Sequence, residues 1–338
     1  MKIFAIGRTR SIAEKVCDEL DLRLSQLEEK KFPDGEMKIH PLEKVEGHDV
    51  FVFHSLGSDN GSSLHDKICE LYFLLSSLKD QGARSLTVAI PYICYARSDL
   101  RKEPFDPLTN RYLAELVELV RVKRVLGLDV HNIPAFENAY HCPAINLEAA
   151  PLFIKYIHAT HMNLKNLVIF SPDIGGIKRT EKFRGQLQLT TGEEIKSGFI
   201  EKYRTSEGLY GQHISDVIEG KNVLIYDDMI STGGTILKAL DACHKKGASS
   251  VRIFSTHGIF CANRDVLLKN EQIEEIVVTD SHPVLQEINR DDYPKLKTLS
   301  CAPLFAHMIR LLGGTHESFP LRGRDDWQGN RPDISLFS

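Results

Sequence analysis

Short apolar segments alternate along this chain with stretches in which apolar residues recur every three or four positions. The short segments predict buried strands, and the periodic stretches predict helices. Their alternation is typical of a mainly parallel sheet flanked by helices, so the sequence predicts an α/β fold. The strand-like segments occupy residues 2–7, 49–55, 85–92, 124–131, 166–173, 222–228, 250–258 and 274–281.

One amphipathic helix is predicted between the second and third of these segments. Apolar residues recur there at spacings of four, three, four and three, which is the period of one helix face. The residues are Leu64, Ile68, Leu71, Leu75 and Leu78. A helix in this place supports the alternation of strands and helices.

The sequence also repeats itself in outline. "GHDVFVF" at 47–53 resembles "GKNVLIY" at 220–226, and "VLGLDVH" at 125–131 resembles "IVVTDSH" at 276–282. Between these pairs, "KDQGARSLTVAIPY" resembles "HKKGASSVRIFSTH". Two related α/β halves are the simplest explanation, and shared secondary-structure patterning alone is the alternative.

Composition narrows the class of protein. The chain has 338 residues, which is ample for two domains. Its formal net charge of −4 argues against a nucleic-acid partner, which favours a basic face. The seven cysteines show no CxxC or CxxH spacing, as expected for reduced thiols. Without a signal-like N-terminus or a membrane-spanning apolar run, we expect a cytoplasmic protein with no membrane partner.

The segment "NVLIYDDMISTGGTI" at 222–236 ends a strand on two adjacent carboxylates, Asp227 and Asp228. Such a pair is costly to bury, so sugar hydroxyls or a cation should compensate it. The turn that follows offers hydroxyls and backbone amides that suit a phosphate. A capped helix after a glycine turn would explain this turn but not the paired aspartates. The sequence therefore predicts a phosphopentose site formed by Asp227, Asp228, Ser231, Thr232, Gly233, Gly234 and Thr235.

A second strand ends in a similar way at "SPDIGGIKR", residues 171–179. The amides of its glycine turn suit a diphosphate, and Asp173 is placed to hold Mg²⁺. In "IEKYR", Lys202 and Arg204 share a face if the backbone is extended. Two such cations are suited to stabilise the negative charge that develops during phosphoryl transfer. The alternative interpretation is that both side chains simply lie in solvent at the edge of a strand.

Two N-terminal segments are less informative by themselves. In "KFPDGEMKIH", Phe32 offers an aromatic face and Asp34 and Glu36 offer acceptors, but a turn between two strands explains them better. In "PYICYARSD", Arg97 could grip nucleotide phosphates while Asp99 holds it in place. A surface ion pair is an equally good explanation for this second segment.

Together these segments, with "LSCAPLFAHMIRLL" near the end, resemble the ribose-phosphate diphosphokinase family in order and spacing. The resemblance implies two tandem phosphoribosyltransferase-like domains, each a mainly parallel sheet flanked by helices. It places nucleotide-side loops in residues 1–146, the ribose 5-phosphate and metal site in 147–312, and a tail at 313–338.

The resemblance also implies a reaction, in which diphosphate passes from ATP to the anomeric hydroxyl of ribose 5-phosphate and AMP leaves. It puts His131 with Asp173 on Mg²⁺, although residue chemistry alone would make His131 a strand-end histidine. It assigns Lys202 and Arg204 to catalysis. It assigns Phe32, Asp34, Glu36, Arg97 and Asp99 to ATP.

The first three of these ATP-binding residues are expected to come from a neighbouring subunit. A homo-oligomer built from dimers, with a hexamer as one form, is therefore expected. A phosphoribosyltransferase and a non-catalytic regulatory homologue are the alternative functions.

The chain departs from the commonest family pattern at two places outside the pentose loop. Ser98 stands where the family commonly has Gln, which leaves adenine selectivity less secure. Glu46 stands where the commonest members have an arginine of a regulatory site for phosphate or ADP. Because a carboxylate repels phosphate, we expect activity without added phosphate and weak allosteric inhibition by ADP.

Overall fold

The computed structural model describes residues 1–204, 210–214 and 218–313. The tail expected at 313–338 begins at the last residue of the final helix and otherwise lies outside this part of the chain. Among the described residues, no helix combines the length and apolar character needed to cross a bilayer.

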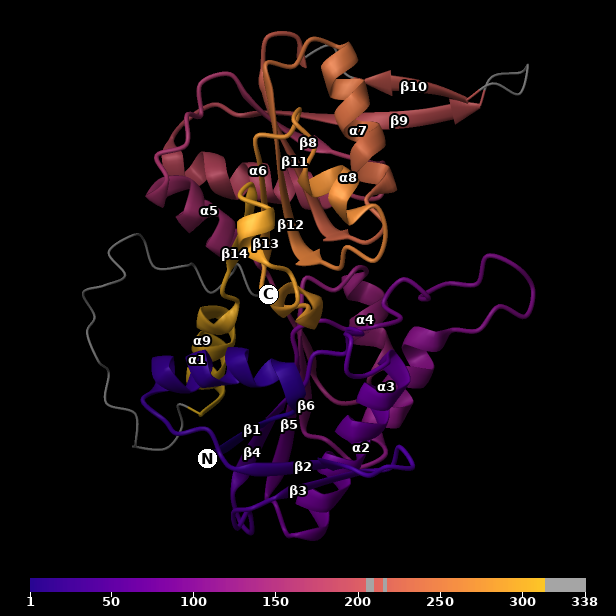
Figure 1. Ribbon diagram of the computed structural model, residues 1–338, viewed down its shortest axis with the longest axis vertical. Helices are drawn as coiled ribbons and strands as arrows, with labels where there is room; N and C mark the ends of the chain where they lie inside the picture. Colours follow the sequence, from indigo (N-terminus) through magenta and orange to yellow (C-terminus); the bar gives the residue numbers. More distant parts are fainter. Residues whose placement is uncertain (205–209, 215–217, 314–338) are drawn as a thin grey trace.

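Two sheets organise the molecule, one in the N-terminal half and one in the C-terminal half (Figure 1). The first is wholly parallel, in the order β1-β4-β5-β6-β7. Its strands are β1 (Lys2–Ala5), β4 (Asp49–Phe53), β5 (Ser85–Ile90), β6 (Arg124–Leu128) and β7 (Ala144–Leu147). A separate antiparallel hairpin pairs β2 (Leu27–Lys31) with β3 (Met37–Pro41).

The second sheet has the order β10-β9-β8-β11-β12-β13-β14 and is parallel except for β10. The outer strands are β9 (Lys196–Arg204), β10 (Tyr210–Ile214) and β14 (Leu296–Leu299). The inner strands are β8 (Leu167–Ser171), β11 (Asn222–Ile230), β12 (Ser250–Gly258) and β13 (Glu275–Thr279). Every strand-like segment expected from the sequence therefore contains a strand, and the expected α/β architecture is confirmed.

Helices cover both faces of each sheet. Those of the N-terminal half are α1 (Arg10–Leu20), α2 (Leu64–Asp80), α3 (Thr109–Glu118) and α4 (Ile133–Ala139). Those that follow β7 are α5 (Ala150–Ala159), α6 (Ile177–Thr191), α7 (Gly234–Lys245), α8 (Arg264–Leu268) and α9 (Ala302–Gly313). The short 3₁₀ helices are η1 (Gly7–Thr9), η3 (Pro283–Gln286) and η4 (Arg290–Asp292). The predicted amphipathic helix is α2, whose Leu71, Leu75 and Leu78 are buried.

The two halves form matching turns at matching places. The amide of Gly47 donates to the carbonyl of Gly82 at 2.9 Å, and that of Gly220 donates to Gly247 at 2.8 Å. All four glycines have positive φ, which disfavours side chains. Glu46 comes directly before Gly47 in the first turn, and its side chain lies over Gly82. A Cβ added to Gly82 would come within 3.3 Å of the Glu46 side chain. The repeated sequence segments therefore form a repeated structure, while the domain boundary after residue 146 remains a prediction.

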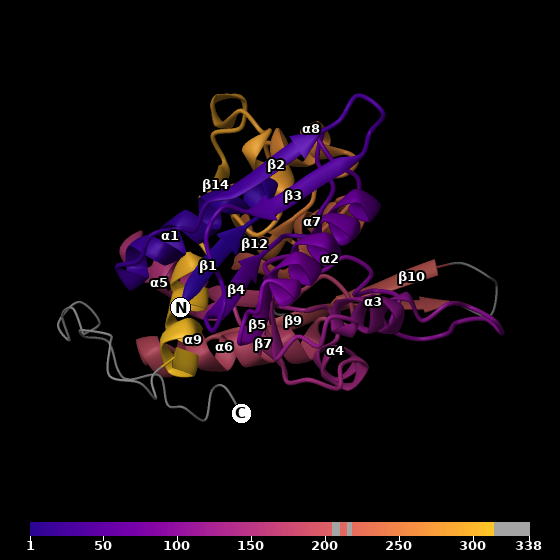
Figure 2. The same cartoon turned by 90° about the horizontal axis from the view of Figure 1, so that it is seen from below.

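One hydrophobic core joins the halves. Alternation along β1 sends Ile3 and Ala5 to the face covered by α1 and α9, while Phe4 faces α2. The same core continues to α5 and α6 on the second sheet. Although α9 is the last helix, it lies beside α1 in both views (Figures 1 and 2), and Phe305 packs edge-on against Phe53. The halves are thus joined by helices from both ends of the chain.

Two buried histidines at the junction of the halves make stability depend on pH. Burial lowers the pKa of His257 to about 4 and that of His282 to about 3. In the unfolded chain each should titrate near ~6.5. The unfolded state therefore gains protons between about pH 6.5 and pH 4 that the folded state does not, and stability falls as the pH falls through this window.

We expect the free energy of unfolding, measured with urea, to decrease from pH 7 to pH 5 by up to about 1.4 kcal/mol per pH unit for each histidine. Burial raises the pKa of Asp129 to about 6, which opposes this trend, so variants are needed to isolate it. His257→Gln should flatten the pH dependence, whereas His158→Gln on the exposed side of α5 should not. Equal slopes in both variants would contradict the assignment.

Candidate active site

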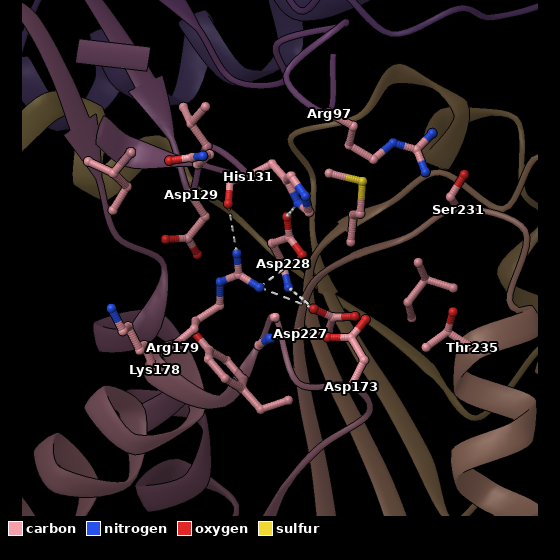
Figure 3. A pocket seen from close by; sticks show the side chains of 18 of the residues that line it. Arg97, Asp129, His131, Asp173, Lys178, Arg179, Asp227, Asp228, Ser231 and Thr235 are labelled. Atoms are coloured by element: carbon pink, nitrogen blue, oxygen red, sulfur yellow. Dashed lines mark hydrogen bonds and ion pairs between the residues drawn. The ribbon is translucent and has the colours of Figure 1, made fainter. Parts of the chain in front are cut away.

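A cavity of about 860 Å³ lies at the carboxyl ends of β8 and β11, facing the loops after β5 and β6. Ligands of open parallel sheets bind at this end of the strands. Figure 3 shows side chains from both halves of the molecule pointing into it. The residues that line it from the N-terminal half include Arg97, Asp99 and His131.

The two aspartates after β11 form the floor of the cavity. The Asp228 side chain is 3% exposed and that of Asp227 is 14% exposed. Arg179 Nη1 donates to Asp227 Oδ1 at 3.1 Å and to Asp228 Oδ1 at 2.9 Å. From the N-terminal half, His131 Nδ1 lies 2.7 Å from Asp228 Oδ2. One guanidinium nitrogen from α6 and an imidazole from the other half thus compensate the adjacent carboxylates.

The pKa values of the two carboxyl groups are shifted in opposite directions. Burial opposes ionisation of Asp228, but the hydrogen bond from His131 and the charge of Arg179 outweigh it and hold its pKa below the usual value. Burial and then the charge of Asp228 raise the pKa of Asp227 well above its usual value. The bond to Asp228 raises the pKa of His131. Asp228 is therefore the carboxyl group of the pair that ionises more readily, and Asp227 is the one that holds its proton more tightly.

Asp173 stands in the tight turn between β8 and α6. Its Oδ1 accepts a hydrogen bond from the amide of Gly176 at 3.0 Å, and its carbonyl accepts one from Ser171 Oγ at 2.7 Å. A Cβ on Gly176 would come within 2.6 Å of that Oγ, so glycine permits the turn. Figure 3 shows the Asp173 carboxylate beside that of Asp227. The two strand ends predicted from sequence thus meet in one cavity.

The loop after β11 curls along the cavity into α7. Ser231, Thr232, Gly233 and Thr235 line the cavity, and Gly234 is the first residue of the helix. Gly233 has a φ of 78°, which explains the need for glycine there. A neighbouring loop supports this one, because Asn263 Nδ2 donates to the carbonyl of Thr232 at 3.2 Å. The predicted pentose loop therefore has the strand–turn–helix setting that a phosphate requires.

Arg97 and Asp99 both line the cavity, as expected for residues on the nucleotide side. Asp99 Oδ2 accepts a hydrogen bond from Asn132 Nδ2 at 2.5 Å, so the donor to Asp99 is Asn132 and not Arg97. The expectation that Asp99 holds Arg97 gains no support from this contact. Asp99 instead ties the loop after β5 to the residue that follows His131.

Phe32, Asp34 and Glu36 lie apart from this cavity, at the tip of the β2–β3 hairpin. The amide of Phe32 donates to the carbonyl of Glu36 at 2.8 Å, and the amide of Glu36 donates to Asp34 Oδ1 at 3.1 Å. The turn predicted from "FPDGE" is therefore confirmed. The side chains of Asp34 and Glu36 are exposed, and the nucleotide role predicted for the three residues stays a prediction that this cavity of the same chain does not explain.

Lys202 and Arg204 lie near the end of β9, where the structure describes the backbone but not the side chains. They pair with Gln212 and Tyr210 of β10. The extended backbone that places both on one face of the strand is therefore present. Their catalytic role remains a prediction.

The sequence interpretation did not assign Arg179, although "SPDIGGIKR" contains it. Arg179 also donates through Nη2 to the carbonyl of His131 at 3.3 Å. It comes from the first turn of α6, as does Lys178, and Lys182 follows one turn later. Basic residues three and four positions apart just after a glycine turn were the available signal.

Comparison with known proteins places the chain in a family. Residues 1–120 match the N-terminal domain of ribose phosphate pyrophosphokinase, and residues 212–319 match the phosphoribosyl synthetase-associated domain. A ribose-phosphate pyrophosphokinase of Clostridium acetobutylicum is 31% identical over 95% of this chain and 96% of its own length. One from Campylobacter jejuni is 34% identical over 91% of this chain and 94% of its own.

Solved structures agree. The crystal structure of phosphoribosylpyrophosphate synthetase from Mycobacterium smegmatis superposes with a TM-score of 0.82 at 28% identity. The match covers 93% of this chain and 99% of that one. On the combined evidence of motifs, fold and relatives, the chain belongs to the ribose-phosphate pyrophosphokinase family.

Proposed function

We propose that this ribose-phosphate pyrophosphokinase transfers diphosphate from ATP to the anomeric hydroxyl of ribose 5-phosphate in the cavity described above, releasing AMP. The observation that carries the proposal is the convergence of the Asp227–Asp228 pair, the 231–235 loop and the Asp173 turn in one cavity. Reactions of this type need alignment and charge stabilisation more than covalent help from the protein.

Ribose 5-phosphate is bound by the C-terminal half in this proposal. Its phosphate lies against the loop of Ser231, Thr232, Gly233, Gly234 and Thr235, at the start of α7. Its hydroxyls donate to the carboxyls of Asp227 and Asp228. The ionised state of Asp228 suits this role, because an ionised carboxylate only accepts hydrogen bonds.

We propose that Mg²⁺ binds beside Asp173. The carboxylate oxygens gathered there suit the ion, and His131 Nδ1 already contacts Asp228, so Nε2 is the ring nitrogen left to act as a ligand. In the described part of the chain, no three His, Cys, Asp or Glu side chains form a metal site on their own. Substrate phosphates would therefore complete the coordination. Bound there, the ion supplies positive charge beside the transferring phosphates.

ATP approaches from the N-terminal half in this proposal. Arg97 grips its phosphates, and Asp99 keeps the loop after β5 in place through Asn132. Phe32, Asp34 and Glu36 bind adenine from a neighbouring subunit, which is why we propose a homo-oligomer. Lys202 and Arg204 stabilise the charge that develops during transfer.

The proposed division of labour follows the two halves. Residues 1–146 supply the nucleotide-side loops and residues 147–312 supply the pentose and metal site. We also propose that the enzyme works in the cytoplasm, which suits its seven unpaired cysteines.

The reaction itself is tested by product analysis. Purified protein with ribose 5-phosphate, ATP and Mg²⁺ should form AMP and phosphoribosyl diphosphate in equal amounts, because the β-phosphorus is attacked. Both products can be measured by chromatography over time. Release of ADP with a singly phosphorylated sugar would reject the proposed chemistry, and absence of any product would favour a non-catalytic role.

Arg179 should be needed because its guanidinium contacts the carboxylates of both Asp227 and Asp228 through Nη1 and the carbonyl of His131 through Nη2. Arg179→Gln should lower kcat/KM for ribose 5-phosphate by roughly 10- to 100-fold, as expected for losing charge-assisted hydrogen bonds. Arg179→Lys should lose less, since it keeps the charge but not the fork. Arg184→Gln, on the same helix but paired with Glu181, is the matched control. Equal kinetics for the Arg179→Gln and Arg184→Gln variants would contradict this role.

The shared nucleotide site predicts complementation between inactive chains. Asp34→Ala should remove the loop given to a neighbour, and Asp227→Ala should remove the pentose site. Oligomers containing both variants should recover part of the wild-type activity, because some interfaces join an intact loop to an intact pentose site. Verified mixed oligomers without any activity would favour a site built within one chain.

A further inference from the structure

The loop after β4, residues 57–63, is the N-terminal counterpart of the pentose-phosphate loop. The order β8-β11-β12-β13-β14 within the second sheet matches the order β1-β4-β5-β6-β7 of the first. In each of these five-strand orders the loop leaves the carboxyl end of the second strand, β4 or β11, and enters a long helix, α2 or α7. The strands before them, β4 and β11, begin at the matching Gly47 and Gly220 turns. By position the first loop is thus a potential phosphate cradle.

Residues of the C-terminal half lie against this loop. Gly57 lies so near His282 that an added Cβ would come within 2.3 Å of its ring. His282 corresponds in the repeated sequence to His131, which reaches the other way into the active site. Gln286 Nε2 also donates to the carbonyl of Arg8 at 2.8 Å. Each half therefore places a histidine from the end of one of its own strands against the other half, His282 at the loop after β4 and His131 at Asp228 of β11.

Carboxylate oxygens accept hydrogen bonds from the backbone amides of the loop. Glu287 Oε1, from the C-terminal half, accepts a hydrogen bond from the amide of Asn60 at 2.8 Å. Asp59 Oδ1 accepts from the amides of Gly61 and Ser62 at 2.8 and 3.0 Å. Two carboxylates therefore occupy the amides of this loop, one from Asp59 within the loop and one from Glu287 of the other half.

Cations complete the surroundings expected of an oxyanion site. Arg8 Nη2 lies 3.0 Å from Glu287 Oε1. Lys67 Nζ lies 2.6 Å from Asp59 Oδ2, and both of these side chains are at most 5% exposed. A buried lysine is costly unless it is paired, so the anions at this place are required and not incidental.

We propose that residues 57–63, with Arg8, form a second oxyanion cradle whose occupant is the carboxylate of Glu287. The cradle binds the chemical group of a phosphate or carboxylate, and the chain supplies that group from its other half. It acts as an intramolecular lock between the halves, and it accepts inorganic phosphate once Glu287 is removed. This inference rests on the fold and not on the proposed reaction.

The test compares thermal unfolding of the full-length protein with and without inorganic phosphate. Glu287→Ala removes the occupant, and Glu271→Ala, an exposed position in the same half, is the matched control. The double variant Glu287→Ala with Arg8→Met removes the cation as well. Wild-type protein gives the background from phosphate at the pentose loop.

Without phosphate, Glu287→Ala should have a lower Tm than Glu271→Ala. Phosphate should then raise its Tm saturably, with a half-maximal concentration at least about tenfold below any wild-type effect, as one charge-assisted contact predicts. The double variant should lose this added response. An equal phosphate response in the single and double variants, or equal Tm values for the two single alanine variants, would overturn the proposal.

If Glu287→Ala does not fold, Glu287→Gln provides the second measurement. It keeps the size of the side chain but removes its charge, so its contact with Arg8 weakens. A Tm below that of the wild type would support the lock. A wild-type Tm would overturn it.

Discussion

The structure depends on the presence of two adjacent carboxylates at the end of a buried strand. Asp227 and Asp228 cannot both remain charged there unless cations approach them. Arg179 comes from α6 of the same half, and His131 comes from the other half. Compensation of one pair of charges thus fixes how α6, β11 and the loop after β6 lie relative to one another.

How far the sequence could predict this arrangement follows from sequence distance. Strands, the Gly176 turn and the 231–235 loop were predictable because each depends on neighbouring residues. Arg179 was missed because its carboxylate partners are 48 and 49 positions away. The contact of Asp99 with Asn132 was not foreseen for the same reason, since the two residues are 33 positions apart. Motifs show which groups gather near a strand end, but only packing shows which groups pair.

Strands with few apolar residues were also harder to predict. β2 has the sequence "LEEKK", and most of it is exposed, so no apolar pattern marks it. β7 and β14 have four residues each, which is too short for a periodic signal. Their positions in the sheets depend on hydrogen bonding to the neighbouring parallel strands, β6 for β7 and β13 for β14. Local pattern thus identified β1 and the central strands of each sheet, while the short or polar strands were determined by tertiary contacts.

The pairing of α1 with α9 has a consequence for the order in which the protein is made. Synthesis proceeds from the N-terminus, and domains usually begin to fold as they emerge. Here the apolar face of α1 and the ring of Phe53 are covered by Phe305 and its neighbours on α9, which are among the last described residues. Until α9 has been translated, this face of the first sheet therefore lacks the part of its cover that α9 supplies, although α1 is already present. Protection of that face during translation is a requirement that this topology places on the cell.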